Sequence, residues 1–294
     1  MGLTDFTTGV AQPTPSLPFM PPTATQTNDL PYLINYNERF VDSADALFRD
    51  EIIDQTLAVI IGNLKPNALL IGAAGVGKTK LVETIAGRIA RNDPSIPEQL
   101  ENSTIYEIPL SSIVSGTGIV GELERKMEEM LEFLTDPAND AIVFIDEIHQ
   151  LISNNPTYER IAQILKPVMA RGDIRLIGAT TLQEAKNLNN DPAFNRRMSK
   201  IIVDELTQEQ TLHIISSYAP KLAAHYGNIN IDPDILPDII QHADRYASAG
   251  AHRPDTALTL LDRACADATI EQGKLLARHS GDPGLMKTIR ATPI

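Results

Sequence analysis

The segment GAAGVGKT, residues 72–79, has the residue types and spacing of a phosphate-binding loop. It follows the apolar run ALLI and precedes the helical pattern KTKLVETIAGRIA, which is the setting that such a loop requires. Glycines let backbone N–H groups converge on phosphate oxygens, and the start of a helix favours an anion. The alternative is a glycine-rich turn with a chance lysine, and the flanking strand and helix favour phosphate binding over it.

Within this loop, two side chains have the chemistry to handle a nucleoside triphosphate and its metal ion. We expect Lys78 to reach the β- and γ-phosphates and the Thr79 hydroxyl to bind Mg²⁺. Thr79 is therefore expected both in the nucleotide-binding site and in the metal site. The full set of expected cofactor-binding residues in the loop is Gly72, Ala73, Ala74, Gly75, Val76, Gly77, Lys78 and Thr79.

A second candidate site is the acidic end of the apolar run AIVFIDE, residues 141–147. Ligands of open α/β sheets lie at the carboxyl ends of strands. We expect Asp146 to hold Mg²⁺ directly or through water, and Glu147 to orient and deprotonate an attacking water. Two acids after a strand are common at a solvated strand end, but the phosphate loop favours the functional interpretation. His149 is interpreted as a supporting or packing residue, since no other ligand is spaced to help it bind a metal.

The elements that must position these residues follow from the hydrophobic pattern. Short apolar runs separated by helical patterns predict an α/β domain with a five-stranded parallel sheet, and the expected strands are 68–71, 104–108, 141–145, 174–179 and 200–203. A helical pattern begins near residue 43. After Val203 the strand patterns stop, and three helical segments at 207–225, 234–247 and 254–272 predict a small C-terminal helical domain.

These patterns divide the chain into four parts. Residues 1–35 are rich in Pro and Thr and contain no Lys or Arg, so we expect a disordered arm, with a docking peptide as the alternative. The α/β nucleotide-binding domain is expected at 36–204 and the helical domain at 205–275. The weakly patterned residues 276–294 are expected to be a tail.

Composition excludes several classes of protein. The net charge of −13 and the absence of a dense basic run argue against nucleic-acid binding that does not depend on sequence. Cys265 is the single cysteine, so neither an intrachain disulfide nor a Cys-based metal site can form. No apolar run has membrane-spanning length, and the N-terminus lacks the pattern of a signal peptide. We therefore expect no membrane partner and a cytoplasmic location.

With both motifs placed, the sequence resembles an AAA+ ATPase, and more narrowly the first ATPase module of the Clp-family protein unfoldases and disaggregases. The resemblance covers about residues 40–272 and rests on ordered phrases, namely LFRDEIIDQTL, LLIGAAGVGKTKLVE, GTGIVGELERKM, IVFIDEIHQL, LKPVMARGDIRLIGATTLQEAK, DPAFNRRM and RPDTALTLLDRA. It implies an AAA+ P-loop domain with a helical lid, and an enzyme that hydrolyses ATP to ADP and phosphate with Mg²⁺. It also implies a homo-oligomer, expected to be a hexamer, and an unidentified protein client.

The resemblance assigns roles to four further residues. Thr181, which closes the run IRLIGATT, resembles the polar sensor of the γ-phosphate or attacking water, and a strand-end cap is the alternative. Arg196 and Arg197 resemble the arginine-finger pair that reaches the ATP of a neighbouring subunit, with two solvated arginines as the alternative. Arg253 resembles a second sensor, a residue that first Clp modules often lack, and a solvated arginine is the alternative.

The glycine-rich segment SGTGIVGEL, residues 115–123, corresponds to the loop that faces the central channel in Clp-type rings. There the family places an aromatic residue, whereas this chain has Ile119 followed by Val120. An isoleucine offers less contact area than a tyrosine, so we expect a weaker grip on a client. A connector without substrate contact is the alternative.

Other departures from the family pattern keep alternative functions open. Phe48 stands where the family has a glycine before the arginine of RDE, which leaves the adenine pocket unassigned. We expect one ATPase module, no folded recruiting domain before it, and no peptidase partner, because no IGF or IGL tripeptide is present. The alternatives to a protein remodeller are a nucleic-acid loader or motor, which the net charge disfavours, and an ATP-gated assembly scaffold that does not thread a chain.

Overall fold

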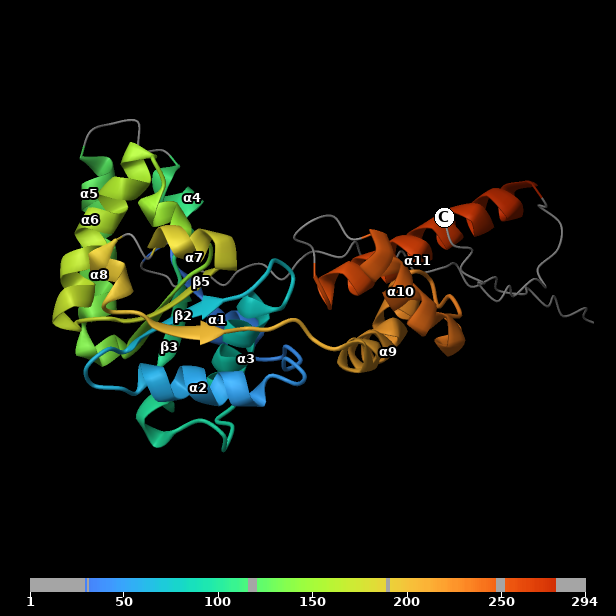
Figure 1. Cartoon of the computed structure of the whole chain (residues 1–294), viewed down its shortest axis with the longest axis horizontal. Helices are drawn as coiled ribbons and strands as arrows, with labels where there is room; N and C mark the ends of the chain where they lie inside the picture. Colours follow the sequence, from blue (N-terminus) through green and yellow to red (C-terminus); the bar gives the residue numbers. More distant parts are fainter. Residues whose placement is uncertain (1–29, 31, 116–120, 189–190, 247–251, 279–294) are drawn as a thin grey trace, which may run out of the picture.

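The computed structural model describes residues 30, 32–115, 121–188, 191–246 and 252–278 of the 294-residue chain. An α/β domain is followed by a smaller helical lid (Figure 1). The sheet has six strands in the order β1-β3-β4-β5-β2-β6. Their bounds are Ile34–Asn35 (β1), Asn67–Ile71 (β2), Thr104–Glu107 (β3), Ala141–Ile145 (β4), Arg175–Thr180 (β5) and Ser199–Ile202 (β6). The five expected strands, β2 to β6, pair in parallel, which confirms the predicted sheet.

Two hydrophobic cores cover the two faces of the sheet, because successive residues of a strand point to opposite sides. Leu69 of β2 and Val143 of β4 belong to one core, and their neighbours Leu70 and Ile142 belong to the other. The central strands β2 and β4 are buried along their whole length, as expected where helices cover both faces.

The helices form one layer on each face (Figure 1). One layer contains α1 (Tyr36–Phe40), α2 (Asp50–Ile60) and α3 (Lys78–Ala90). The other contains α4 (Leu110–Val114), α5 (Glu122–Thr135), α6 (Pro156–Arg171), α7 (Leu182–Leu188) and α8 (Pro192–Asn195). The residues of α3 that its pattern assigned to a buried stripe all lie in the core, namely Leu81, Val82, Ile85, Ala86 and Ile89.

Three expectations from the sequence are wrong at element ends. The arm predicted for residues 1–35 is wrong at its C-terminal end, because Leu30 and Leu33 are buried and Ile34–Asn35 forms β1, antiparallel to β3. The helix expected from residue 43 begins only at Asp50. At the other end, α11 (Asp255–Arg278) continues past the expected start of the tail at residue 276.

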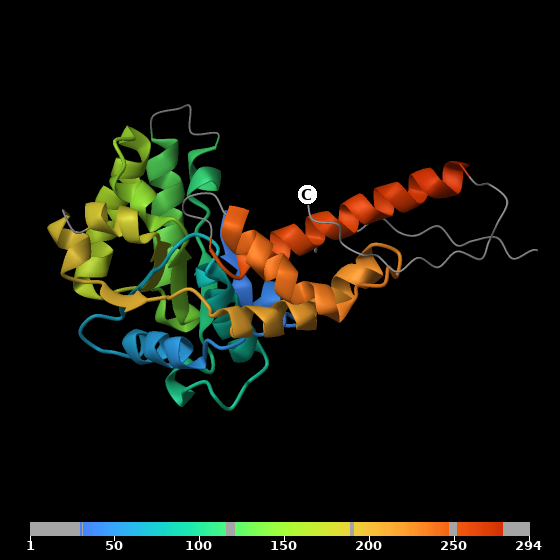
Figure 2. The same ribbon diagram turned by 45° about the vertical axis from the view of Figure 1, so that its right-hand side comes forward.

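The lid has a hydrophobic core of its own. It consists of α9 (Gln208–His225), α10 (Leu236–Tyr246) and α11, packed around Ile215 and Leu261. Thr207 and Gln210 form a reciprocal capping box that starts α9 directly after the last strand. Figure 2 shows α11 extending away from the α/β domain. None of the described helices is both long and apolar enough to cross a lipid bilayer.

The lid touches the phosphate loop at Gly75. This glycine has φ +81°, and a Cβ atom on it would lie 2.6 Å from the Asp255 Cβ and 3.1 Å from the His252 carbonyl oxygen. A second contact joins the domains where the Phe48 ring meets the His213 ring of α9 edge-on, with 5.3 Å between centroids. The lid therefore packs against the phosphate loop and against the segment before α2.

We predict that Gly75→Ala destabilises the protein more than Gly172→Ala does. Both glycines have φ near +80°, so both substitutions incur a similar strain of about 1–2 kcal/mol. Only Gly75 lacks room for a Cβ, whereas an added Cβ at Gly172 meets nothing within 4 Å. Overpacking should lower the Tm of Gly75→Ala by a further ~5 °C, measured by thermal unfolding. Equal losses in the two variants would mean that the lid does not rest on the loop in solution.

Candidate functional site

The predicted catalytic segments meet because three strands are neighbours in the sheet. β5 lies between β2 and β4, and all three run in parallel. The phosphate loop follows β2, Asp146 and Glu147 follow β4, and Thr181 follows β5. Since the carboxyl ends of parallel strands share one edge, residues distant in sequence form one site there.

The phosphate loop has the backbone that its glycines predict. Gly75 and Gly77 have φ +81° and +96°, which only glycine adopts readily, and α3 starts directly afterwards. Lys78 is 7% exposed, and its Nζ donates to the carbonyl oxygens of Gly72 and Ala73, each at 2.9 Å. Burial lowers the pKa of Lys78, while the nearby charges of Glu147 and Asp146 oppose that shift. The lysine thus lies inside the loop that would surround a phosphate.

Thr79 and Asp146 form the candidate metal site. The Thr79 hydroxyl donates to Asp146 Oδ2 at 2.7 Å, and the Glu147 backbone N–H donates to Asp146 Oδ1 at 2.9 Å. Mg²⁺ prefers oxygen ligands at 2.0–2.1 Å in an octahedron, whose neighbouring ligands are about 2.9 Å apart. The donor set and the oxygen spacing therefore fit a magnesium ion between Thr79 and Asp146.

Glu147 has an unusual backbone and electrostatic setting. Its φ is +50°, a left-handed conformation that places it at the sharp turn after β4. Burial raises the pKa of its carboxyl, and the negative charge of Asp146 raises it further. A carboxylate that binds protons more readily than usual is suited to act as a general base.

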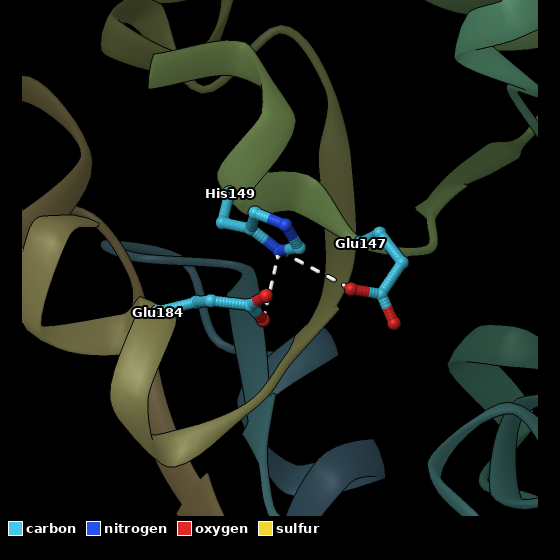
Figure 3. Close-up of side chains that lie close together, drawn as sticks. All are labelled: Glu147, His149 and Glu184. Atoms are coloured by element: carbon cyan, nitrogen blue, oxygen red, sulfur yellow. Dashed lines mark ion pairs between the residues drawn. The ribbon is translucent and has the colours of Figure 1, made fainter. Parts of the chain in front are cut away.

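A cluster beside Glu147 was not predicted from the sequence. His149 Nδ1 lies 3.2 Å from Glu147 Oε2 and 3.1 Å from Glu184 Oε2, as Figure 3 shows. The expectation that His149 has no further ligand-type residue near it is wrong, because α7 carries Glu184 to it from the next strand. The three residues offer metal-type ligand atoms within 4.8 Å of one another, and hydrogen bonding among them explains their arrangement.

Arg49, the arginine of the RDE phrase, makes a contact that the sequence did not predict. The residue is 6% exposed, and its Nη2 atom donates to the Val76 carbonyl oxygen at 2.8 Å. The contact fastens the start of α2 to the phosphate loop. Its position in the phrase LFRDE was visible, but the partner 27 residues away was not.

Family comparisons agree with this geometry. Residues 68–206 match the model of the ATPase family associated with various cellular activities (AAA), and residues 207–280 match the AAA lid domain. The chain belongs to the AAA family of ATPases. The resemblance stated from the sequence is confirmed, as is the α/β fold with a helical lid.

Proteins similar to this AAA ATPase include chaperones and a heat shock protein. The AAA ATPase is 36% identical over 245 residues to the chaperone protein ClpB of Dichelobacter nodosus, an alignment covering 82% of this chain and 28% of that protein. Heat shock protein 100 of Trypanosoma brucei brucei is 35% identical over 225 residues, 76% of this chain and 25% of that protein. The chain thus spans about a quarter to a third of these relatives.

Solved structures give the same result. The S. cerevisiae Hsp104–ADP complex superposes with a TM-score of 0.76 at 32% identity, over 85% of this chain and 35% of that chain. A closed state of Hsp104 with ATPγS and FITC-casein gives a TM-score of 0.73 at 33% identity, over 83% of this chain and 43% of that chain. The AAA ATPase therefore shares the fold of a nucleotide-binding module.

The predicted arginine pair lies at the opposite end of the sheet from the phosphate loop. Arg197 precedes β6, whose first residue Ser199 pairs with Ala68 at the start of β2, and the Arg197 carbonyl accepts from Asn67. The loop follows the other end of β2, roughly 15 Å further along at 3.3 Å per residue. Arg196 is exposed and Arg197 half-buried, and within the part of the chain that the structure describes neither guanidinium has an ion-pair partner.

The remaining predicted residues are placed differently. Arg253 lies beside the loop contact of the lid, but its Nε is 3.0 Å from Glu205 Oε1 and 3.4 Å from Asp244 Oδ1. Its guanidinium is therefore already paired within the lid, and a sensor role stays a prediction. Ile119 and Val120 of the predicted channel loop lie outside the described residues.

The site separates nucleotide binding from hydrolysis, which two substitutions test. Lys78→Ala should abolish ATP binding, because the loop loses its cation. Glu147→Gln should bind ATP with near-normal affinity while kcat falls at least ~100-fold, since it removes the base and leaves the phosphate loop intact. Calorimetry and phosphate release measure the two quantities. Glu159→Gln, an exposed glutamate of α6, is the matched control and should change neither. Normal turnover by Glu147→Gln would contradict the catalytic assignment.

Proposed function

We propose that this AAA ATPase hydrolyses Mg·ATP to ADP and phosphate, and uses the energy to remodel or unfold a protein partner as part of a homo-oligomeric ring. The observation that carries the hydrolytic part is the juxtaposition of Thr79, Asp146 and Glu147 beside the phosphate loop. The similarity to ClpB and Hsp104 supports a protein partner. Because the chain spans only part of those proteins, the partner and the assembly belong to this proposal.

Each residue of the candidate site has a separate role in ATP hydrolysis. Backbone amides of the loop and Lys78 hold the phosphates, and Thr79 and Asp146 would hold Mg²⁺. Mg²⁺, when bound, offsets negative charge on the phosphate oxygens. Glu147 accepts a proton from the attacking water as the water oxygen bonds to the γ-phosphorus and the bond to the β-phosphate oxygen breaks. Thr181, at the end of β5, contacts the γ-phosphate or that water.

A neighbouring subunit completes the site. Arg196 and Arg197 lie at the opposite end of the strands from their own phosphate loop, so neither can reach the nucleotide of its own chain without a large movement. In a ring, each pair would reach the next subunit's ATP, where an arginine beside the γ-phosphate accelerates transfer by about 10³–10⁵. A hexamer is the proposed ring, and catalysis then depends on assembly.

The lid connects the nucleotide to movement. Gly75 packs against Asp255, and Phe48 packs against His213, so a change in the loop shifts the lid. Rotation of the lid relative to the α/β domain would move the loop 115–123, in which Ile119 and Val120 contact the client. Arg253 is the remaining proposed cofactor residue, and reaching nucleotide would require it to leave Glu205.

The proposed partner is a protein rather than a nucleic acid. One solved relative contains Hsp104 together with FITC-casein, which is a protein, and the net charge of −13 repels a phosphate backbone. No feature supports a peptidase partner, and the cytoplasmic location stays a prediction from the sequence.

Binding of FITC-casein to Glu147→Gln tests this proposal by fluorescence anisotropy. We expect binding with ATP at least ~10-fold tighter than with ADP, because the variant keeps the ATP state, and no ATP effect in Lys78→Ala. Fluorescein-labelled single-stranded DNA is the parallel probe. Salt-sensitive, ATP-dependent binding of the DNA instead of casein would favour the loader alternative. ATP-dependent assembly with binding of neither probe would favour the scaffold.

A further inference from the structure

The His149 side chain lies next to Glu147 and Glu184, and Glu184 in turn contacts Thr181. Nδ1 of His149 has three acceptor-type oxygens near it, at 3.2 Å in Glu147, 3.1 Å in Glu184 and 3.3 Å in Thr180. A carboxylate oxygen can only accept, so Nδ1 carries the proton in this arrangement. One N–H shared between two carboxylates bonds each more weakly than it would bond one alone, so Glu147 and Glu184 compete for the same donor.

Glu184 is in turn bound to the strand-end threonines. Its Oε2 accepts from the Thr181 hydroxyl at 2.7 Å, from the Thr181 backbone N–H at 3.2 Å and from the Thr180 hydroxyl at 3.5 Å. Burial acts to raise the pKa of Glu184, but the hydrogen bonds from Thr181 outweigh it and the pKa is lowered. The carboxylate is therefore charged and remains an acceptor. The hydrogen bond from the Thr181 hydroxyl is the shortest that it accepts from the two threonines.

We infer that Glu184 and His149 are positioning residues that link Thr181 to Glu147, so that engagement of Thr181 by nucleotide releases the catalytic carboxylate. The inference rests on the proposed hydrolytic function. When the Thr181 hydroxyl turns to a phosphate oxygen or to the attacking water, Glu184 Oε2 loses its shortest hydrogen bond. It then draws the Nδ1–H of His149 towards itself. Glu147 loses this donor and is free to accept a proton from water.

The arrangement in Figure 3 shows why the link is local. His149 comes from the segment after β4 and Glu184 from α7 after β5, and the carboxylates of Glu184 and Glu147 lie on either side of the His149 Nδ1 atom. The path from Thr181 to Glu147 passes through two side chains and requires no movement of a strand. A competition of this kind couples the two residues through a shared proton donor.

A double-mutant cycle on kcat tests the link. We expect Glu184→Gln to lower kcat in the wild-type background, because the neutral amide draws the Nδ1–H of His149 less strongly and leaves this donor on Glu147. In the His149→Ala background the same substitution should cost about fivefold less in kcat, with KM for ATP unchanged, because the link is already absent. His149→Asn should restore most of the coupling, since its amide nitrogen lies near the position of Nδ1. Additive effects of Glu184→Gln and His149→Ala would overturn the inference.

Two controls keep this test decisive. His225→Ala removes an exposed histidine of the lid and should combine additively with Glu184→Gln. If His149→Ala fails to fold, His149→Phe replaces it, because its ring fills a similar volume without an N–H donor. A wild-type chain with no more ATPase activity than Lys78→Ala would refute the proposed function and the link with it. Normal ATPase activity with an additive cycle would refute the link alone.

Discussion

The hydrogen bond between the Thr79 hydroxyl and the Asp146 carboxylate joins two segments that are 67 residues apart in the sequence. It forms because β5 separates β2 from β4 by one strand, so that the ends of the two outer strands face each other across a short gap. Lys78 follows β2 and Glu147 follows β4, and their charges are close enough to interact. The placement of phosphate, metal and base all depends on this spacing between strands.

Much of this arrangement could be predicted from local patterns. The central strands are apolar runs because both of their faces are covered. The motif GAAGVGKT predicts a loop between a strand and a helix, and it lies between β2 and α3. Asp146 and Glu147 were predictable because they end a buried strand. These features depend on neighbouring residues in the sequence, so the sequence of this chain was enough to indicate them.

The features that were missed depend on contacts that no local pattern encodes. Glu184 reaches His149 only because β4 and β5 are adjacent, and Arg49 reaches Val76 only because α2 starts beside the loop. The two-residue strand β1 is too short to show a period, and the pairing of Arg253 with Glu205 depends on how α11 meets the end of the sheet. The predicted roles of Arg196 and Ile119 concern neighbouring subunits and a client, which lie outside any single chain.

The Mg²⁺ dependence of ATPγS affinity, measured by calorimetry on the chain and on Asp146→Asn, tests the account most directly. If Thr79 and Asp146 hold the metal of a nucleotide–metal complex, Mg²⁺ will strengthen binding to the wild-type chain by about tenfold or more, and the substitution will remove most of that gain. Equal affinity of the wild-type chain with and without Mg²⁺ would contradict the assignment of this pair as the metal site.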